Sequence, residues 1–267
     1  MSNLSDPTYL KNNQYQDSSN LSARAALHER FSTDKTSWHA WVFQQLQIPT
    51  QARILEIGCG PGYFWRKNQP QISSGWRVAM TDLSQGMLKE ARTALRDSAA
   101  FSYTLLDGGC LPFPESFFDA VLANHVLYHL PAVQPALQEI HRVLKKGGTL
   151  YAATNGEGHL REIREWEKRF LPENDPQQWG TITTSFNLEN GAHQLQAFFN
   201  PVQRRLHPGQ LEINQAPPVL QYIESYYDQD GAREPLARLR AYLEEVLQEK
   251  GSLTVSKETG LFLAKKP

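Results

Sequence analysis

Residues 53–62, Arg-Ile-Leu-Glu-Ile-Gly-Cys-Gly-Pro-Gly, are the stretch of sequence that predicts the fold. A short apolar run comes first, and glycines follow at three alternate positions, Gly58, Gly60 and Gly62. An apolar run of this length is typical of a buried parallel strand. Glycines after it let the backbone turn sharply and let a ligand approach closely. The stretch therefore predicts an α/β fold in which a ligand lies on the glycine turn.

The spacing of the glycines argues against a dinucleotide as that ligand. The dinucleotide fingerprint places its third glycine three residues after the second, where this chain has Tyr63. Glu56, inside the apolar run, is poorly placed to help a pyrophosphate but well placed to hold a ligand that carries positive charge. A nicotinamide-dependent oxidoreductase is therefore disfavoured.

The glycine turn resembles motif I of the class I S-adenosylmethionine-dependent methyltransferases, in particular the small-molecule branch of the ubiquinone and menaquinone type. In that family the loop lies under the methionyl part of the cofactor. The resemblance implies S-adenosyl-L-methionine as the cofactor and S-adenosyl-L-homocysteine as its product. It also implies that the loop residues contact the cofactor: Glu56, Gly58, Cys59, Gly60 and Gly62.

Asp82 ends the next expected strand, residues 77–81. It follows the glycine loop by about 20 residues, the distance at which nucleotide-binding α/β folds place a ribose-binding carboxylate. An ionised carboxylate accepts well from both ribose hydroxyls, and Leu83 and Met87 would border the adenine. Asp82 could instead be a helix cap, but Ser84 is better placed for that role.

Asp107 and Gly108 follow the third expected strand, residues 101–106. In the class I family the acid at this position accepts from the exocyclic amine of adenine. Asp-Gly is also a common turn, and the local sequence fits that interpretation equally well. The order of the elements along the chain favours the cofactor role.

Asn124 and His125 follow the fourth expected strand, residues 117–123, at the end where open parallel sheets bind ligands. We expect Asn124 to contact the cofactor and the methyl group to point toward this pair. His125 is the first candidate for a catalytic residue, as a hydrogen-bond partner or as a base with a pKa near neutrality. His129 is either a second candidate or a histidine that satisfies a helix entry. A metal site at these two histidines is disfavoured because no third ligand is evident.

Residues 1–48 are predicted to form an N-terminal helical segment. One helix would begin with Ser19 or Asn20 as its cap, and a second would carry Trp38 and other apolar residues that packing explains. In proteins that resemble this one, the segment folds over the cofactor as a lid, and a tyrosine there often lies near the sulfonium. Tyr15 is therefore the third candidate for a catalytic residue, and Arg24 and His28 in the first helix also stand out.

Residues 49–267 are predicted to form the cofactor-binding domain. Its fold class is α/β, with a Rossmann-like class I methyltransferase sheet of about seven strands and helices on both faces. The last two strands, residues 202–207 and 260–265, would form a hairpin with one antiparallel member. Helices inserted at about 217–250 carry tyrosines that either cover the acceptor or pack in the core: Tyr222, Tyr226 and Tyr227.

Composition narrows the class of partner. The chain has 267 residues, a formal charge of −1 and no run of basic residues, which argues against nucleic-acid binding. No apolar run approaches the roughly 20 residues of a membrane span. Cys59 and Cys110 form no metal-spaced pair, so a reduced, cytoplasmic protein is expected. We expect a monomer or homodimer that acts on a small molecule.

Direct displacement at the sulfonium methyl is the predicted reaction, with a nitrogen or oxygen of a small apolar or aromatic metabolite as the acceptor. Two alternatives stay open. An RNA methyltransferase would need a basic face or an appended binding module. A non-catalytic protein would hold S-adenosylmethionine without turnover.

Overall fold

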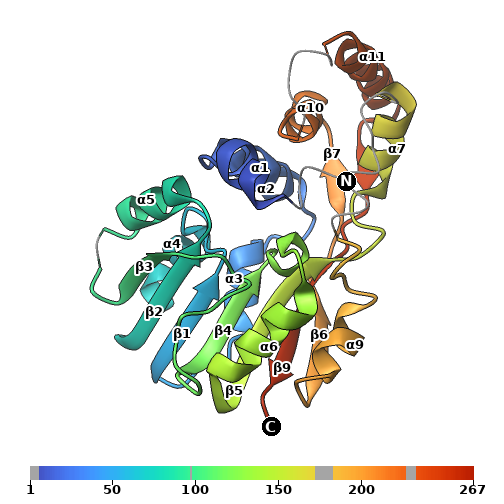
Figure 1. Ribbon diagram of the computed structural model, residues 1–267. Helices are drawn as coiled ribbons and strands as arrows, with labels where there is room; N and C mark the ends of the chain where they lie inside the picture. The colour runs from blue at the N-terminus through green and yellow to red at the C-terminus, as the bar shows by residue number, and fades with distance from the viewer. Residues whose placement is uncertain (1–5, 97, 172–182, 227–232) are drawn as a thin grey trace.

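One seven-stranded sheet organises the molecule. The computed structural model describes residues 6–96, 98–171, 183–226 and 233–267. The strands lie in the order β3-β2-β1-β4-β5-β9-β6 (Figure 1). Their bounds are β1 Gln51–Ile57, β2 Gly75–Asp82, β3 Phe101–Leu105, β4 Phe118–Asn124, β5 Leu144–Asn155, β6 Val202–Leu206 and β9 Thr259–Lys265.

The pairing of the strands confirms the predicted sheet and its final hairpin. The first five strands pair in parallel, whereas β9 runs antiparallel to both of its neighbours, β5 and β6. The chain order reverses between β1 and β4, because β2 and β3 extend the sheet on one side and β4 and β5 on the other. Ligands of open parallel sheets bind outside the carboxyl ends of the strands at such a point.

Helices cover both faces of the sheet. On one face lie α3 (Trp38–Gln44), α4 (Tyr63–Asn68) and α5 (Gln85–Ala94), and on the other lie α6 (Val133–Val143) and α9 (Gly191–Gln196). The alternation of β1 explains how one strand serves both layers: Leu55 and Ile57 pack with α6, and Ile54 packs with α4. Glu56 shares the face of Ile54 and is buried with it.

A third apolar cluster holds the remaining elements together above the sheet. It joins α2 (Ser19–Phe31) with α7 (Arg161–Phe170), α10 (Pro217–Glu224) and α11 (Arg233–Lys250). It also contains two short strands, β7 (Leu211–Ile213) and β8 (Leu253–Val255), which form a second sheet. The insertion, which is the segment between β6 and β9, therefore contains helices where they were expected, at 217–224 and 233–250; residues 227–232 lie outside the described residues. It also contains a two-stranded sheet that was not predicted.

The N-terminal segment begins with α1 (Pro7–Tyr9) and a π-helical turn over Leu10–Gln14. Helix α2 follows and lies above the carboxyl end of the sheet, against α10 and β7 (Figure 1). The predicted cap of α2 is wrong: Ser18 is the N-cap residue and makes no side-chain cap. Instead Asp17 Oδ1 accepts from the backbone N–H of Ser19 at 2.9 Å, which satisfies one of the free donors of the first turn.

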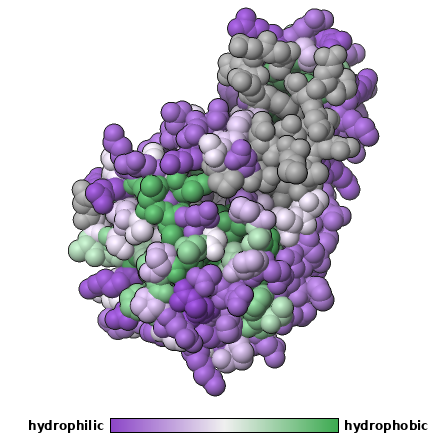
Figure 2. All heavy atoms as spheres, viewed as in Figure 1, coloured by the Kyte–Doolittle hydropathy of each residue, from purple (hydrophilic) through white to green (hydrophobic). Residues whose placement is uncertain are grey.

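The surface of this face is mostly polar. Figure 2 shows apolar atoms gathered at mid-height, below α1 and α2, with hydrophilic surface above and below. Among the described helices, none combines the length and the apolar character that crossing a membrane requires.

Candidate cofactor and acceptor site

A cavity of about 590 Å³ lies at the carboxyl ends of β1, β2 and β4, beneath α2. Its volume falls within the roughly 300–1,000 Å³ of small-molecule sites. Thirteen of the predicted site residues line it: Tyr15, Glu56, Gly58, Cys59, Gly60, Asp82, Leu83, Met87, Asp107, Gly108, Asn124, His125 and His129.

Gly62 is the predicted residue that does not line the cavity. Its φ is +74°, and a Cβ there would lie 3.2 Å from the Cβ of Ala91 on α5. Contact between Gly62 and the cofactor therefore stays a prediction, and the packing against α5 gives this glycine a second role. Gly62 allows a left-handed turn and close packing of α5.

Gly58 and Gly60 also have left-handed backbones, with φ of +67° and +54°. Their surroundings differ. A Cβ at Gly58 would lie 2.6 Å from Val126 Cγ2, whereas at Gly60 the nearest atom would be Leu21 Cδ2 at 3.6 Å. Space above the turn is therefore open at Gly60, where a ligand can approach the backbone.

Glu56 is buried and already has two hydrogen-bond donors. Trp65 Nε1 donates to Oε2 at 2.6 Å, and Asn124 Nδ2 lies 3.4 Å from Oε1. Burial raises the pKa of the carboxyl to about 8. Asn124 Oδ1 is buried and accepts no hydrogen bond from any described residue. Asn124, which lines the cavity, thus has a buried carbonyl oxygen without a described donor, and the contact with Glu56 fixes the orientation of its amide.

Asp82 connects the glycine turn to α5. Its Oδ2 accepts from the Gly60 N–H and its Oδ1 from the Ser84 N–H, both at 2.8 Å. Ser84 Oγ accepts from the Met87 N–H at 3.2 Å and caps α5, as predicted. Burial raises the pKa of Asp82. Each carboxylate oxygen has a second lone pair, so Asp82 retains the capacity to accept from a ligand.

Asp107 lies exposed at the edge of the cavity, and its Oδ1 accepts from the Gly109 N–H at 2.9 Å. This is the turn hydrogen bond that the sequence allowed, and it leaves Oδ2 for a ligand. Gly108 is buried, and a Cβ there would lie 2.8 Å from Ile57 Cγ2. The loop therefore packs its backbone closely against the end of β1.

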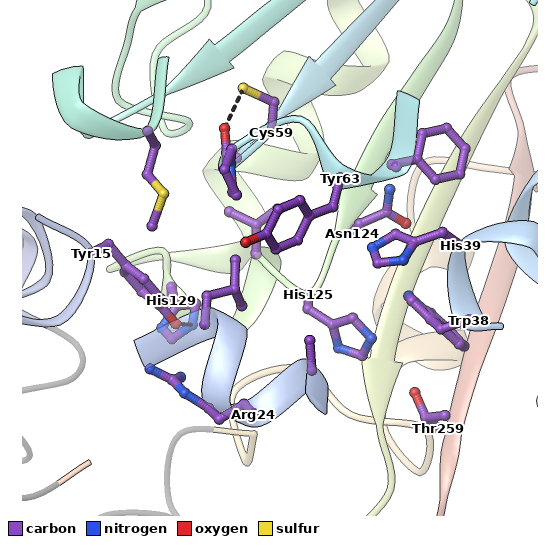
Figure 3. Close-up of a pocket in the computed structure, with 18 of the residues that line it drawn as sticks. Tyr15, Arg24, Trp38, His39, Cys59, Tyr63, Asn124, His125, His129 and Thr259 are labelled. Atoms are coloured by element: carbon purple, nitrogen blue, oxygen red, sulfur yellow. Dashed lines mark hydrogen bonds between the residues drawn. The ribbon is translucent and has the colours of Figure 1, made fainter. Parts of the chain in front are cut away.

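Tyr15 and His129 form a pair across the cavity. The Tyr15 hydroxyl lies 3.2 Å from His129 Nε2, and the two rings meet edge to face (Figure 3). Tyr15 precedes α2, and His129 lies in the 3₁₀ turn Leu127–His129 that follows β4. The sequence suggested each residue separately, and the structure brings them together.

His125 also lines the cavity, and its ring lies 5.0 Å from that of Trp38 (Figure 3). Its backbone is left-handed, with a φ of +54°. Burial, reinforced by His28, His39 and His129, lowers the pKa of His125 to about 3. The predicted pKa near neutrality is therefore wrong. His125 is a neutral imidazole at physiological pH, able to accept a hydrogen bond but weak as a base.

Several cavity residues were missed or assigned only to packing. They are aromatic rings, imidazoles and one amine: Trp38, His39, Tyr63, Tyr128, His159, His207 and Lys257. His159 stacks on His28 with ring centroids 5.4 Å apart. Lys257 Nζ donates to Ser32 Oγ at 2.9 Å. These residues come from distant segments with no shared motif, so no local pattern identifies them.

The described residues include no group of three or more His, Cys, Asp and Glu side chains placed to hold a metal ion. Tyr227, one of the tyrosines expected near the acceptor, lies outside the described residues.

A family model described as a methyltransferase domain matches residues 55–152. The chain is 38% identical over 117 residues to the malonyl-[acyl-carrier protein] O-methyltransferase of Enterobacter lignolyticus, which covers 43% of each protein. It is 31% identical over 114 residues to the ubiquinone/menaquinone biosynthesis C-methyltransferase of Coxiella burnetii, covering 42% of this chain and 46% of that protein. The matched part thus spans about half the length of these curated relatives.

Solved structures share the fold over more of the chain. A putative methyltransferase from Bacillus halodurans has a TM-score of 0.61 at 19% identity, covering 86% of this chain and 99% of its own. Phosphoethanolamine N-methyltransferase 2 of Haemonchus contortus, in complex with S-adenosyl-L-methionine, has a TM-score of 0.59 at 19% identity, covering 98% of this chain and 60% of its own.

Four observations point to the same fold and the same kind of site. They are the glycine turn, the acids at the end of β2 and after β3, the strand order, and the match to a methyltransferase domain over residues 55–152. Residues 55–152 therefore match a methyltransferase domain, and the chain as a whole shares the fold of solved methyltransferases.

Proposed function

We propose that this protein transfers a methyl group from S-adenosylmethionine to a nitrogen or oxygen of a small acceptor with an apolar or aromatic skeleton. The observation that carries the proposal is that one cavity contains both the residues expected to bind the cofactor and the candidates expected to face the acceptor. Aromatic rings in its wall suit a flat or apolar skeleton: Trp38, Tyr63, Tyr128, Tyr222 and Tyr226.

The residues present fit the cofactor. Leu83, Met87 and the Asp107–Gly108 loop would hold the adenine, and Asp82 would accept from the ribose hydroxyls. The unpaired Asn124 Oδ1 would accept from the ammonium group of the methionyl part, close to the open backbone at Gly60. When bound, the cofactor supplies an electrophilic methyl carbon on a positively charged sulfur.

The chain's own contribution would be alignment of the acceptor. Orienting a nucleophile for direct displacement accounts for several kcal/mol in well-organised sites. The neutral His125 imidazole would accept a hydrogen bond from the acceptor's O–H or N–H and so fix its direction. With a pKa of about 3, it would orient the acceptor more than deprotonate it.

The names of related proteins span different acceptor atoms. The matched relatives include an O-methyltransferase and a C-methyltransferase, and the fold is shared with an N-methyltransferase. The preference for nitrogen or oxygen here rests on the polar groups of the cavity, because the site shows hydrogen-bond partners suited to an O–H or N–H nucleophile.

Isothermal titration calorimetry with S-adenosylmethionine, S-adenosylhomocysteine and NAD tests the first half of the proposal. We expect binding of the first two and none of the third; binding of NAD alone would contradict it. Release of S-adenosylhomocysteine with panels of amines, phenols and acids tests the second half. Tight binding of the cofactor without release for any acceptor class would favour the non-catalytic alternative.

A further inference from the structure

Arg24 has an unused hydrogen-bonding edge inside the cavity. Its Nε donates to the backbone carbonyl of Asn20 at 3.1 Å. Its Nη2 is buried and donates to no described residue. None of the ion pairs found among the described residues includes Arg24. A guanidinium stays charged at all physiological pH values and has five donors in one plane, so no carboxylate of the described residues neutralises this charge.

Two tyrosine rings flank the guanidinium and interact with it, and Nη2 is the nitrogen left without a described partner. The Arg24 Cζ lies 4.1 Å from the centroid of the Tyr226 ring and 5.6 Å from that of Tyr15 (Figure 3 shows Arg24 beside Tyr15 and His129). Stacked rings hold a guanidinium in position. Nε is engaged by Asn20, but Nη2 keeps its N–H groups for an acceptor in the plane of the guanidinium, and a carboxylate can accept from that side.

The charges nearby do not replace such a ligand. Glu29 pairs with Lys67, and Glu56 and Asp82 are engaged at the glycine turn. Buried Glu167 lines a smaller adjoining cavity together with Arg24 and Arg164, but no ion pair joins it to Arg24. Burial lowers the pKa of two imidazoles in the main cavity, to about 4 for His28 and about 3 for His125, and so keeps them neutral.

The position of Arg24 along α2 separates it from the glycine turn. Leu21 is the residue of α2 closest to Gly60. Arg24 is three residues further along the helix, a rise of roughly 4.5 Å, and His28 is one turn beyond it. All three line the cavity. Arg24 therefore faces the part of the cavity that contains Tyr15, Tyr128 and His129.

We propose that Arg24 binds a carboxylate of the methyl acceptor, so that the substrate is an organic acid with an apolar or aromatic skeleton. The proposal specifies the acceptor of the proposed function, and it rests on that function because only a methyltransferase has a methyl acceptor. Carboxylate and phosphate share the chemistry that an arginine recognises, and the cofactor has a carboxylate of its own. The experiment must separate these three sources.

The test measures the binding of matched fragments to protein saturated with S-adenosylhomocysteine. Benzoate and phenylacetate are compared with benzamide, phenylacetamide and phenyl phosphate, by ligand-observed NMR titration. We expect each acid to bind about ten-fold more tightly than its amide. The preference should disappear in Arg24→Gln and fall in Arg24→Lys, which keeps the charge but loses the planar guanidinium. Arg169→Gln is the matched control, because Arg169 also stacks on two rings, Phe170 and Tyr242, but lies outside both cavities.

Equal binding of acids and amides to the wild-type protein, or no binding of either, would overturn the proposal. So would a preference for phenyl phosphate over the acids. If Arg24→Gln weakens S-adenosylhomocysteine binding while the acid preference survives, Arg24 serves the cofactor's carboxylate and the proposal fails. Circular dichroism verifies folding, and Arg24→Lys supplies the comparison if Arg24→Gln unfolds.

A different result would refute the proposed function. Absence of S-adenosylmethionine and S-adenosylhomocysteine binding by the wild-type protein would refute it, and the acid and amide comparison in cofactor-free protein would still decide whether Arg24 is an anion site.

Discussion

At the end of the cavity that is proposed to bind the cofactor, called the cofactor end, the wall is made of strand ends and loops of β1, β2, β3 and β4, all between Glu56 and Asn124. At the opposite end, which is proposed to bind the acceptor and is called the acceptor end, the wall is made of side chains from separate segments: the N-terminal helices, the turn after β4, the loop before α7 and the insertion before β9. The first end depends on sheet topology, which brings strand ends together. The second depends on how distant segments pack.

The two ends also differ in the groups they bury. The cofactor end contains carboxyls whose pKa values burial raises, Glu56 to about 8 and Asp82 in the same direction. The acceptor end contains imidazoles whose pKa values burial lowers, to about 4 for His28 and about 3 for His125. The carboxyls of the cofactor end therefore lower the free energy of unfolding as pH rises, and the imidazoles of the acceptor end lower it as pH falls.

The largest effect is expected from Glu56→Gln. Below pH 4.5 the carboxyl is protonated in both states. Between 4.5 and about 8, the unfolded carboxyl loses its proton and the folded one keeps it, which lowers the free energy of unfolding by about 1.4 kcal/mol per pH unit. Glutamine does not titrate, so the variant does not lose stability in this way. The free energy of unfolding of the variant minus that of wild type should therefore increase by on the order of 3 kcal/mol between pH 5 and pH 8.

Urea denaturation of both proteins at pH 5, 6.5 and 8 measures this difference. Glu165→Gln, an exposed position on α7, is the matched control. Parallel stability curves for wild type and Glu56→Gln would show that the buried carboxyl does not have the raised pKa.

Asp82→Ala should weaken S-adenosylhomocysteine binding by about 100-fold, because it would remove the two charge-assisted hydrogen bonds that Asp82 is proposed to accept from the ribose. Calorimetry measures the change. Because Asp82 also accepts from the Gly60 and Ser84 N–H groups, Asp82→Asn is included to keep the shape of the side chain. Affinity within three-fold of wild type in the alanine variant would remove Asp82 from the cofactor site.

His125→Asn should lower turnover by roughly 30-fold with cofactor affinity kept, because it acts on the acceptor end alone. Asparagine is chosen because it tolerates the left-handed backbone of His125 better than alanine does. Since the pKa of His125 is about 3, the pH profiles of wild type and variant should run parallel from pH 5 to 8. Unchanged turnover, or an inflection near pH 6.5 that only the variant loses, would contradict this role.

Tyr15→Phe is expected to have the smallest effect. It removes the hydroxyl that lies 3.2 Å from His129 Nε2, and one hydrogen bond contributes about 1 kcal/mol. We therefore expect a fall of roughly 3- to 10-fold in kcat/KM without a change in S-adenosylhomocysteine affinity. Tyr9→Phe, in the same segment but outside the cavity, should leave both values unchanged. A matching loss in the two variants would assign the effect to the segment's packing.

The difference between the two ends explains what could be predicted from the sequence. The strand at residues 51–57, the glycine turn, Asp82 and the Ser84 cap are signalled by neighbouring residues, because a strand end and the loop that follows it are adjacent in the chain. Topology then brings these loops to one edge of the sheet. The cofactor end was therefore accessible to local patterns.

The rest depended on burial, which no local pattern shows. The role of Gly62 is set by Ala91 on another helix, and the pKa of His125 is set by the segments that cover it. The short strands β7 and β8 have three residues each, too few for a periodic signal. Arg24 stood out in the sequence, but its flanking ring Tyr226 lies in the insertion, so its environment could not be inferred.

The position of β9 imposes an order on folding. In the large sheet, the neighbour of the edge strand β6 is β9, and β9 is synthesised only after the whole insertion. Residues 202–206 cannot acquire their ladder until residues 259–265 are available to pair with them. On a nascent chain, the parallel strands β1 to β5 can therefore pair before β6 has a partner. During refolding, the amides of β6 should become protected from exchange no earlier than those of β9.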